Sequence, residues 1–370
     1  MSTPIPQPPA IPFIGNVKSI DAELPVNSFL LLAKQYGEIY KLDMLGKEVV
    51  VVNSVALAQE VLDEKRFHKT LNAPLVEVDN MGTGLFTARH GDPEWGIAHR
   101  VLMPIFGPLS IREMFDDMYD ILSQLCLKWE RFGPMHSIQS NSDFSRLTFD
   151  TISFCAYNYR LNNFYSLEDP PFVKAMGDYL VESLMRSRRP SIVTAVSYGA
   201  KAKYAEDIAI MQKLASEIIE DRKKHPIEKK DLLNAMLLGK DPVTGQGLTD
   251  KNIQAQMLTF LIAGHETTSG MLSFAMTHIL SIPKVYAQVR QEVDSVLGKE
   301  PMKPEHLSKL PYITAVLRET LRVTPSIAQF TVGPYKDEII GNGKYLIKKD
   351  ATVNVLAAAI GKDPEVWGED

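Results

Sequence analysis

Residues 249–281, TDKNIQAQMLTFLIAGHETTSGMLSFAMTHILS, carry the strongest helical pattern in the chain. Apolar residues recur there at spacings of three and four, which predicts a helix. Thr249 is a favourable N-cap residue, and Pro283 follows where the pattern ends. Such a helix would be about 45 Å long. Because it is apolar on most sides, we expect it to lie at the centre of a helical core.

The middle of this predicted helix is polar. Residues 263–270 read AGHETTSG, with two glycines, three hydroxyl side chains, a histidine and a glutamate. A glycine costs a helix about 1 kcal/mol relative to alanine, and burying Glu266 without a partner is also costly. One interpretation is a polar notch beside a bound molecule. The other is a helix that is bent only for packing.

Two short motifs resemble one enzyme family. Residues 263–268, AGHETT, resemble the oxygen-activation motif on the long central helix of the cytochrome P-450 monooxygenases. Residues 319–322, ETLR, resemble the Glu-x-x-Arg motif of the same family, about fifty residues further along. In a helix, residues three apart share a face, so the glutamate and the arginine can pair.

Longer phrases are similar to one subgroup, the self-sufficient fatty-acid hydroxylases, whose haem domain is fused to a flavin reductase. These phrases are FLIAGHETTSG, LTFDTISFCAYNYR, GKDPVTGQGL and GLFTA, and the likeness extends from about Pro6 to the last residue. The resemblance implies a mainly α fold with a small β region. It also implies a single cytochrome P-450 haem domain over residues 1–370.

The resemblance assigns roles to the polar middle of the helix. Thr268, together with Thr267, would present a hydroxyl on the oxygen-activating side of the haem. Glu266 would relay protons, consistent with a carboxyl in a general-acid role. Ala263 and Gly264 would leave room for O₂ beside the haem.

Two aromatic residues on a second predicted helix are candidate cofactor ligands. Trp95 and His99 are four apart, so they share a helix face. The resemblance implies that each donates a hydrogen bond to a haem propionate, and that Lys69 reaches a propionate as well. For His99, an ordinary surface or core position is the alternative.

The resemblance places the substrate pocket in and near residues 67–92, which show no sustained periodicity and are expected to form a long loop. Phe86 would lie over the haem, and Leu75 would line the pocket. Lys47 stands where the subgroup has an arginine that pairs with the fatty-acid carboxylate, but lysine lacks the bidentate fork. Core packing for Phe86 remains an alternative. For Lys47 the alternative is an exposed position in the turn Leu45-Gly46-Lys47 of a hairpin that we expect to join strands at residues 38–44 and 48–52.

The family's haem-cysteine loop has no counterpart in this sequence. Cys126 and Cys155 lack its context, so we expect no metal ligand among the residues present and a chain truncated before that loop. Glu319 and Arg322 would have a structural role, and the expected loss of their partner would leave a buried charged pair unsatisfied. We therefore expect weak haem binding and poor folding.

Composition excludes several other classes. The net charge of −5 gives no strong attraction to nucleic acid. No leader and no membrane anchor are recognisable, and two cysteines imply no disulfide framework, which together fit a cytoplasmic protein.

The expected function is that of a haem-thiolate monooxygenase. It would hydroxylate a fatty acid or similar lipid with O₂ at heme b. Electrons would come from NADPH through the FAD and FMN of a fused or separate reductase. The alternatives are an inactive truncated fragment, a helical binding scaffold without iron, or a monooxygenase of another apolar substrate.

Overall fold

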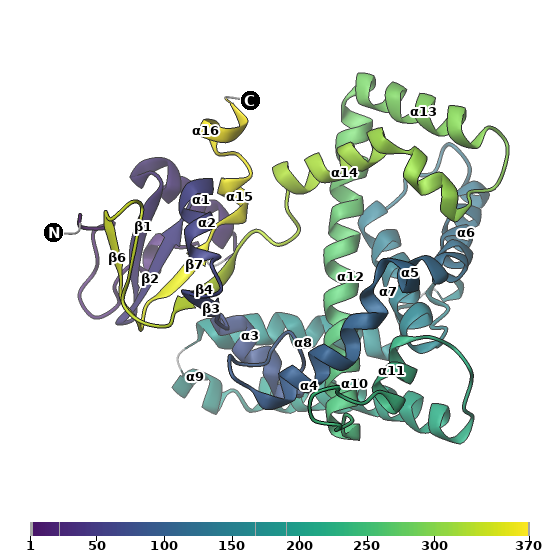
Figure 1. Cartoon of the computed structure of the whole chain (residues 1–370), viewed down its shortest axis with the longest axis horizontal. Coiled ribbons are helices and arrows are strands. Elements are labelled where there is room, and N and C mark those ends of the chain that lie inside the picture. Colours follow the sequence, from purple (N-terminus) through teal and green to yellow (C-terminus); the bar gives the residue numbers. More distant parts are fainter. Residues whose placement is uncertain (1–2, 22, 167, 190, 369–370) are drawn as a thin grey trace. The chain divides into compact units, whose positions relative to one another are not determined.

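The computed structural model describes residues 3–21, 23–166, 168–189 and 191–368. It is mainly helical with a small β region, as the sequence predicts (Figure 1). The chain divides into two compact units. Unit 1 comprises Met1–Asn72 and Thr314–Asp370, and unit 2 comprises Ala73–Ile313. Each unit is described by itself.

Unit 2 consists of helices. They are α3 (Ala73–Val78), α4 (Pro93–Leu102), α5 (Pro108–Glu113), α6 (Phe115–Phe132), α7 (Ser140–Tyr157), α8 (Pro171–Arg188), α9 (Ser191–Val196), α10 (Tyr198–Lys224), α11 (Leu232–Leu238), α12 (Asp250–Ser281) and α13 (Pro283–Leu297), with 3-10 helices at Asp79–Met81, Met103–Phe106, Asn163–Tyr165 and Pro304–Lys309. The expected loop at residues 67–92 is thus partly wrong, because its first half forms a short strand and short helices. No helix within the described ranges is both long enough and apolar enough to cross a membrane.

Helix α12 is the predicted central helix, drawn as the long green helix in Figure 1. Thr249 caps its first turn by accepting a hydrogen bond from the Asn252 N–H. The polar middle does not interrupt the helix, because its hydroxyls bond back to helix carbonyls. Thr267 Oγ1 donates to the Ala263 carbonyl at 2.9 Å, and Ser269 Oγ donates to the Glu266 carbonyl at 3.2 Å.

Helix α7 packs along α12 in the antiparallel direction. The Tyr157 hydroxyl donates to the Met257 carbonyl at 3.2 Å, whereas Thr148 Oγ1, nearer the start of α7, donates to the His265 carbonyl at 3.0 Å. Apolar residues of α7, α8, α10, α11 and α12 join in one buried cluster. Burial of this cluster is the main stabilising contribution to unit 2.

Within the described ranges, every strand lies in unit 1. Its elements are α1 (Pro25–Tyr36), β1 (Ile39–Met44), β2 (Lys47–Val52), α2 (Val55–Val61), β3 (Phe67–Lys69), β4 (Phe330–Pro334), β5 (Glu338–Ile340), β6 (Tyr345–Ile347), β7 (Thr352–Val355), α15 (Ala357–Ile360) and α16 (Pro364–Trp367), with a 3-10 helix at Val17–Ser19. Helix α14 (Pro311–Val323) lies mostly in this unit.

The main sheet of unit 1 has the strand order β1-β2-β7-β4-β3, and β5 pairs with β6 in a second sheet. Strands β1 and β2 form the predicted hairpin, and β2 runs parallel to β7. Alternate residues of β2 face opposite sides. Val50 and Val52 join the cluster with Leu57 of α2, whereas Val51 joins the cluster with Phe29 of α1. Both faces of the sheet are therefore covered.

Candidate functional site

One face of α12 meets the segment that leads into α4. The backbone N–H of Leu85 donates to Gln256 Oε1 at 2.9 Å. Asn252, one turn earlier, donates from Nδ2 to Glu94 Oε2 at 2.9 Å. A Cβ added at Gly84 would lie only 2.1 Å from Thr259 Oγ1. Asn252, Gln256 and Thr259 thus mark the side of α12 that faces residues 82–94.

The same face continues into the polar middle of α12. Successive helix residues are rotated by about 100°, so Ala263 and Thr267, seven and eleven positions after Gln256, lie on its side. Thr268 lies about 100° further round than Thr267. The sequence assigns the main hydroxyl to Thr268, but the structure places Thr267 on the face that meets residues 82–94. Of the two candidate threonines, Thr267 is therefore the one on that face.

Gly264 lies where α12 meets α7. A Cβ added there would lie 3.1 Å from Cγ1 and 3.3 Å from Cδ1 of Ile152, which belongs to α7. The missing side chain therefore allows α7 to approach α12 closely. The expected space for O₂ at Gly264 stays a prediction, and Thr268, one turn later, belongs to the same side of the helix.

The two ionisable residues of the polar middle have different surroundings. The side chain of Glu266 reaches solvent, yet the surrounding protein displaces enough water to raise the pKa of its carboxyl. His265 is 8% exposed, and burial lowers its pKa to about 4. Its ring meets the edge of Phe149, with 5.3 Å between centroids. His265 is therefore neutral at pH 7, whereas Glu266 can gain or lose a proton.

Trp95 and His99 lie side by side on α4, as predicted. Their rings are stacked, with 4.6 Å between centroids and 19° between planes. Asp92 caps the helix by accepting a hydrogen bond from the Glu94 N–H. Trp95 is 42% exposed, so this pair presents ring nitrogens at the surface of unit 2. Such a pair can donate hydrogen bonds to an anionic group.

The candidate substrate residues of unit 2 lie in the preceding segment. Leu75 is half-buried in α3, and Phe86 is 40% exposed between α3 and α4. Thr87 Oγ1 accepts a hydrogen bond from the Gly84 N–H at 3.1 Å and closes a turn around Phe86. The turn holds a large apolar ring at the surface of unit 2.

Lys47 and Lys69 lie in unit 1. Lys47 is exposed at the start of β2, directly after the turn at Leu45 and Gly46, which both have positive φ. Lys69 ends β3, and partial burial lowers the pKa of its ammonium group. The expected roles of both lysines rest on the resemblance alone.

Glu319 and Arg322 are paired on α14. Arg322 donates from Nε and Nη2 to the two carboxylate oxygens of Glu319 at 2.7 and 2.5 Å, and from Nη1 to the Gly361 carbonyl at 2.7 Å. Its guanidinium also lies 5.0 Å from the Trp367 ring centroid. The expected unsatisfied pair is therefore wrong, because Glu319 is largely exposed and Arg322 has bonding partners within unit 1.

Neither cysteine has the surroundings of an activated thiolate. Burial raises the pKa of the Cys155 thiol, on α7, to about 12. Cys126, on α6, also has a raised pKa, through partial burial and the charge of Glu130. Thiolates that bind metals require the opposite shift. Across the described ranges, no group of three or more His, Cys, Asp or Glu side chains could hold a metal ion.

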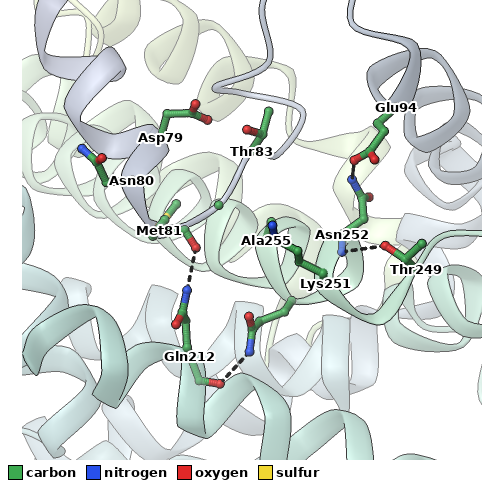
Figure 2. Close-up of a pocket in the computed structure, with 12 residues that line it drawn as sticks. Asp79, Asn80, Met81, Thr83, Glu94, Gln212, Thr249, Lys251, Asn252 and Ala255 are labelled. Atoms are coloured by element: carbon green, nitrogen blue, oxygen red, sulfur yellow. Dashed lines mark hydrogen bonds between the residues drawn. The ribbon is translucent and has the colours of Figure 1, made fainter. Parts of the chain in front are cut away.

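The structure also contains a polar cavity that was not expected from the sequence. It has a volume of about 380 Å³ and lies between residues 79–83, Glu94, Gln212 and the first turns of α12. Figure 2 shows Glu94 and Asn252 joined by a hydrogen bond at its edge. The sequence does hold a signal for polar contacts near this cavity. Asn252 and Gln256 are spaced four apart in the apolar half of α12, so they share one face of the helix.

Comparison with known proteins identifies the family. The family model described as "Cytochrome P450" matches residues 5–370. A self-sufficient cytochrome P450 monooxygenase from Phanerodontia chrysosporium is 52% identical over 100% of this chain and 35% of its own length. A bifunctional cytochrome P450/NADPH–P450 reductase from Aspergillus oryzae is 48% identical over 99% of this chain and 34% of its own length. Another, from Fusarium oxysporum, is 48% identical over 100% of this chain and 35% of its own length. The chain thus spans about a third of these relatives, and it belongs to the cytochrome P450 family.

Proposed function

We propose that this chain is the haem-binding part of a monooxygenase that hydroxylates a fatty acid or a similar lipid. Electrons would come from NADPH through the FAD and FMN of a reductase. Family membership and the printed names of the relatives support this proposal, since those proteins join a cytochrome P450 to an NADPH–P450 reductase. A cytoplasmic location is part of the same proposal.

The observation that carries the proposal is the arrangement of α12. Ala263 offers a small side chain on the face that meets residues 82–94, and the Thr267 hydroxyl on that face is held by the Ala263 carbonyl at 2.9 Å. A hydroxyl that donates to a carbonyl keeps its lone pairs for a further donor. Glu266, with its raised pKa, is suited to hold a proton and to pass it on at its carboxyl oxygens.

The residues of unit 2 fit the oxygen-binding side and the edge of a haem. Trp95 and His99 would donate hydrogen bonds to its carboxylates, and Ala263 would leave space beside its face. The haem, when bound, supplies the oxygen-activating chemistry. Neither Cys126 nor Cys155 is assigned as a ligand that would hold the haem iron, because neither stands in a sequence like the family's haem-cysteine loop.

The substrate is proposed to be apolar because Phe86 and Leu75 present apolar side chains in the same unit. Lys47 is the candidate for pairing with a carboxylate, as a point charge without the bidentate fork of arginine. A fatty acid and the alcohol of equal chain length differ only in that anionic group. Comparing the two separates a lysine-anchored fatty acid from another apolar substrate.

The test is spectroscopic and chemical. The full-length protein, reduced and exposed to CO, is expected to show the absorption of a thiolate-ligated haem. It should convert dodecanoic acid to hydroxylated products at the expense of NADPH, and Lys47→Ala should raise KM for dodecanoic acid but not for 1-dodecanol. Absence of the haem spectrum, or of any NADPH-dependent product from either substrate, would refute the proposed function.

A further inference from the structure

Two buried amide side chains in the first half of α12 require an explanation. Gln256 is 1% exposed and Asn252 is 6% exposed, as deeply buried as the apolar residues Ile253, Ala255 and Met257 of the same helix. A buried amide is costly unless its polar atoms are hydrogen-bonded. Apolar residues would serve the core equally well, so the hydrogen bonds that these amides make are the property to examine.

The two amides connect two separate segments to α12. Gln256 Oε1 accepts from the Leu85 N–H at 2.9 Å, and Gln256 Nε2 donates to Asn252 Oδ1 at 3.3 Å. Asn252 Nδ2 then donates to Glu94 Oε2 at 2.9 Å. A continuous chain of hydrogen bonds therefore runs from the backbone beside Phe86 to the first turn of α4. Figure 2 shows its last link, at the edge of the polar cavity.

The backbone around Leu85 is seated directly on α12. A Cβ at Gly84 would lie 2.1 Å from Thr259 Oγ1 and 3.2 Å from the Ala255 carbonyl oxygen, and one at Gly82 would lie 3.0 Å from the Ala255 Cβ. Only glycine permits these contacts. Phe86 thus follows a residue whose N–H is held by Gln256 and precedes Thr87, which closes the turn.

We propose that Gln256 and Asn252 are positioning residues for the substrate. They hold Phe86 on one side and the Trp95–His99 pair on the other in a defined register against Ala263 and Thr267. This inference rests on the proposed function and extends it to specificity. The amides do not touch the substrate. Gln256 acts through the backbone of Leu85, next to Phe86, and Asn252 acts through the side chain of Glu94, next to Trp95. Loss of Gln256 then lets Phe86 move and changes which carbon of the substrate is hydroxylated.

The experiment compares two glutamines of the same helix. Gln256→Met keeps the length of the side chain and removes its hydrogen bonds. Gln254→Met is the matched control, because Gln254 bonds the Gln212 carbonyl and Ser216 Oγ of α10 instead. Gln256→Glu is the second variant, and it retains an oxygen acceptor for the Leu85 N–H. All three are made in the full-length protein.

Amide hydrogen exchange at Leu85 is the first measurement. We expect exchange at least about tenfold faster in Gln256→Met, and within about twofold of the parent in Gln254→Met. Gln256→Glu keeps the acceptor but buries a carboxyl and loses the bond to Asn252 Oδ1, so its exchange should lie between these two. The second measurement is the ratio of hydroxylated positions on dodecanoic acid, which should change in Gln256→Met and stay constant in Gln254→Met.

Unchanged exchange in Gln256→Met, or an unchanged product ratio despite faster exchange, would overturn the positioning role in a protein that contains haem. Equal changes in Gln254→Met would overturn it as well, because they would indicate a general loosening of α12. A parent protein without haem would instead end the proposed function, and this inference with it.

Discussion

Replacing Gly84 by alanine tests how closely residues 82–94 are seated on α12. The added Cβ would lie 2.1 Å from Oγ1 and 2.9 Å from Cβ of Thr259, whereas ordinary contacts begin near 3.4 Å. Thr259 is β-branched, buried and helical, so it has few alternative rotamers. The loop must therefore move away from the helix. Overpacking of this kind costs about 1–3 kcal/mol, which corresponds to a fall in Tm of about 2 to 12 °C for a unit of this size.

The same substitution at Gly177 provides the control. Gly177 lies on the exposed side of α8, and an added Cβ would meet nothing within 4 Å. Gly177→Ala should raise Tm, because alanine is favoured over glycine in a helix by about 1 kcal/mol. Thermal unfolding followed by circular dichroism measures both variants. A Tm for Gly84→Ala at or above that of the parent protein would refute the close contact between Gly84 and Thr259.

Two further predictions concern buried ionisable groups. His265→Phe should flatten the pH dependence of stability between pH 6.5 and about 4. The pKa of folded His265 is lowered to about 4, so between these pH values the unfolded state binds a proton that the folded state does not. The parent protein therefore loses up to about 3 kcal/mol of unfolding free energy as the pH falls. Identical pH profiles for the two proteins would contradict this. The guanidinium of Arg222 bonds both carboxylate oxygens of the fully buried Asp231, at 3.0 and 2.8 Å. Arg222→Met leaves that carboxylate unpaired, so chemical denaturation should show unit 2 destabilised by about 3–5 kcal/mol. Adding Asp231→Asn should recover part of that loss, and a double variant as unstable as the single one would contradict the explanation.

Local signals predicted the main elements of the fold. The periodicity of residues 249–281, the cap at Thr249 and the following Pro283 located α12 to within one residue at its start. The turn at Leu45 and Gly46 located the β1–β2 hairpin. The signals for the helix and for the hairpin both lie within a few residues of the structure they specify, and for this reason both could be read from the sequence.

The orientation of the site could not be predicted in this way. Helical periodicity shows that Gln256 and Thr267 share a face, but only the contacts of Gln256 with Leu85 and of Gly84 with Thr259 show which segment meets that face. The sequence alone therefore does not show which of the two threonines, Thr267 or Thr268, meets that segment. A glycine such as Gly264 is equally consistent with open space and with close packing, and only the structure shows that Ile152 lies beside it.

The prediction of a destabilising pair at Glu319 and Arg322 failed for a different reason. A charged pair is costly only where both groups are buried and unpaired. The sequence does not report that the Glu319 carboxylate is exposed, or that Arg322 reaches the Gly361 carbonyl from α14. These two facts depend on how β7 and α15 fold back in unit 1.

The comparison of Thr267→Ala with Thr268→Ala tests the central claim most directly. The quantity to measure is hydroxylated dodecanoic acid formed per NADPH oxidised by the full-length protein. Because Thr267 presents its hydroxyl on the face shared with Ala263, we expect Thr267→Ala to lower this ratio about fivefold, the effect of about 1 kcal/mol from one lost hydrogen bond. Thr267→Ser and Thr268→Ala should leave it close to the parent value. A large loss in Thr268→Ala with an unchanged ratio in Thr267→Ala would contradict the account.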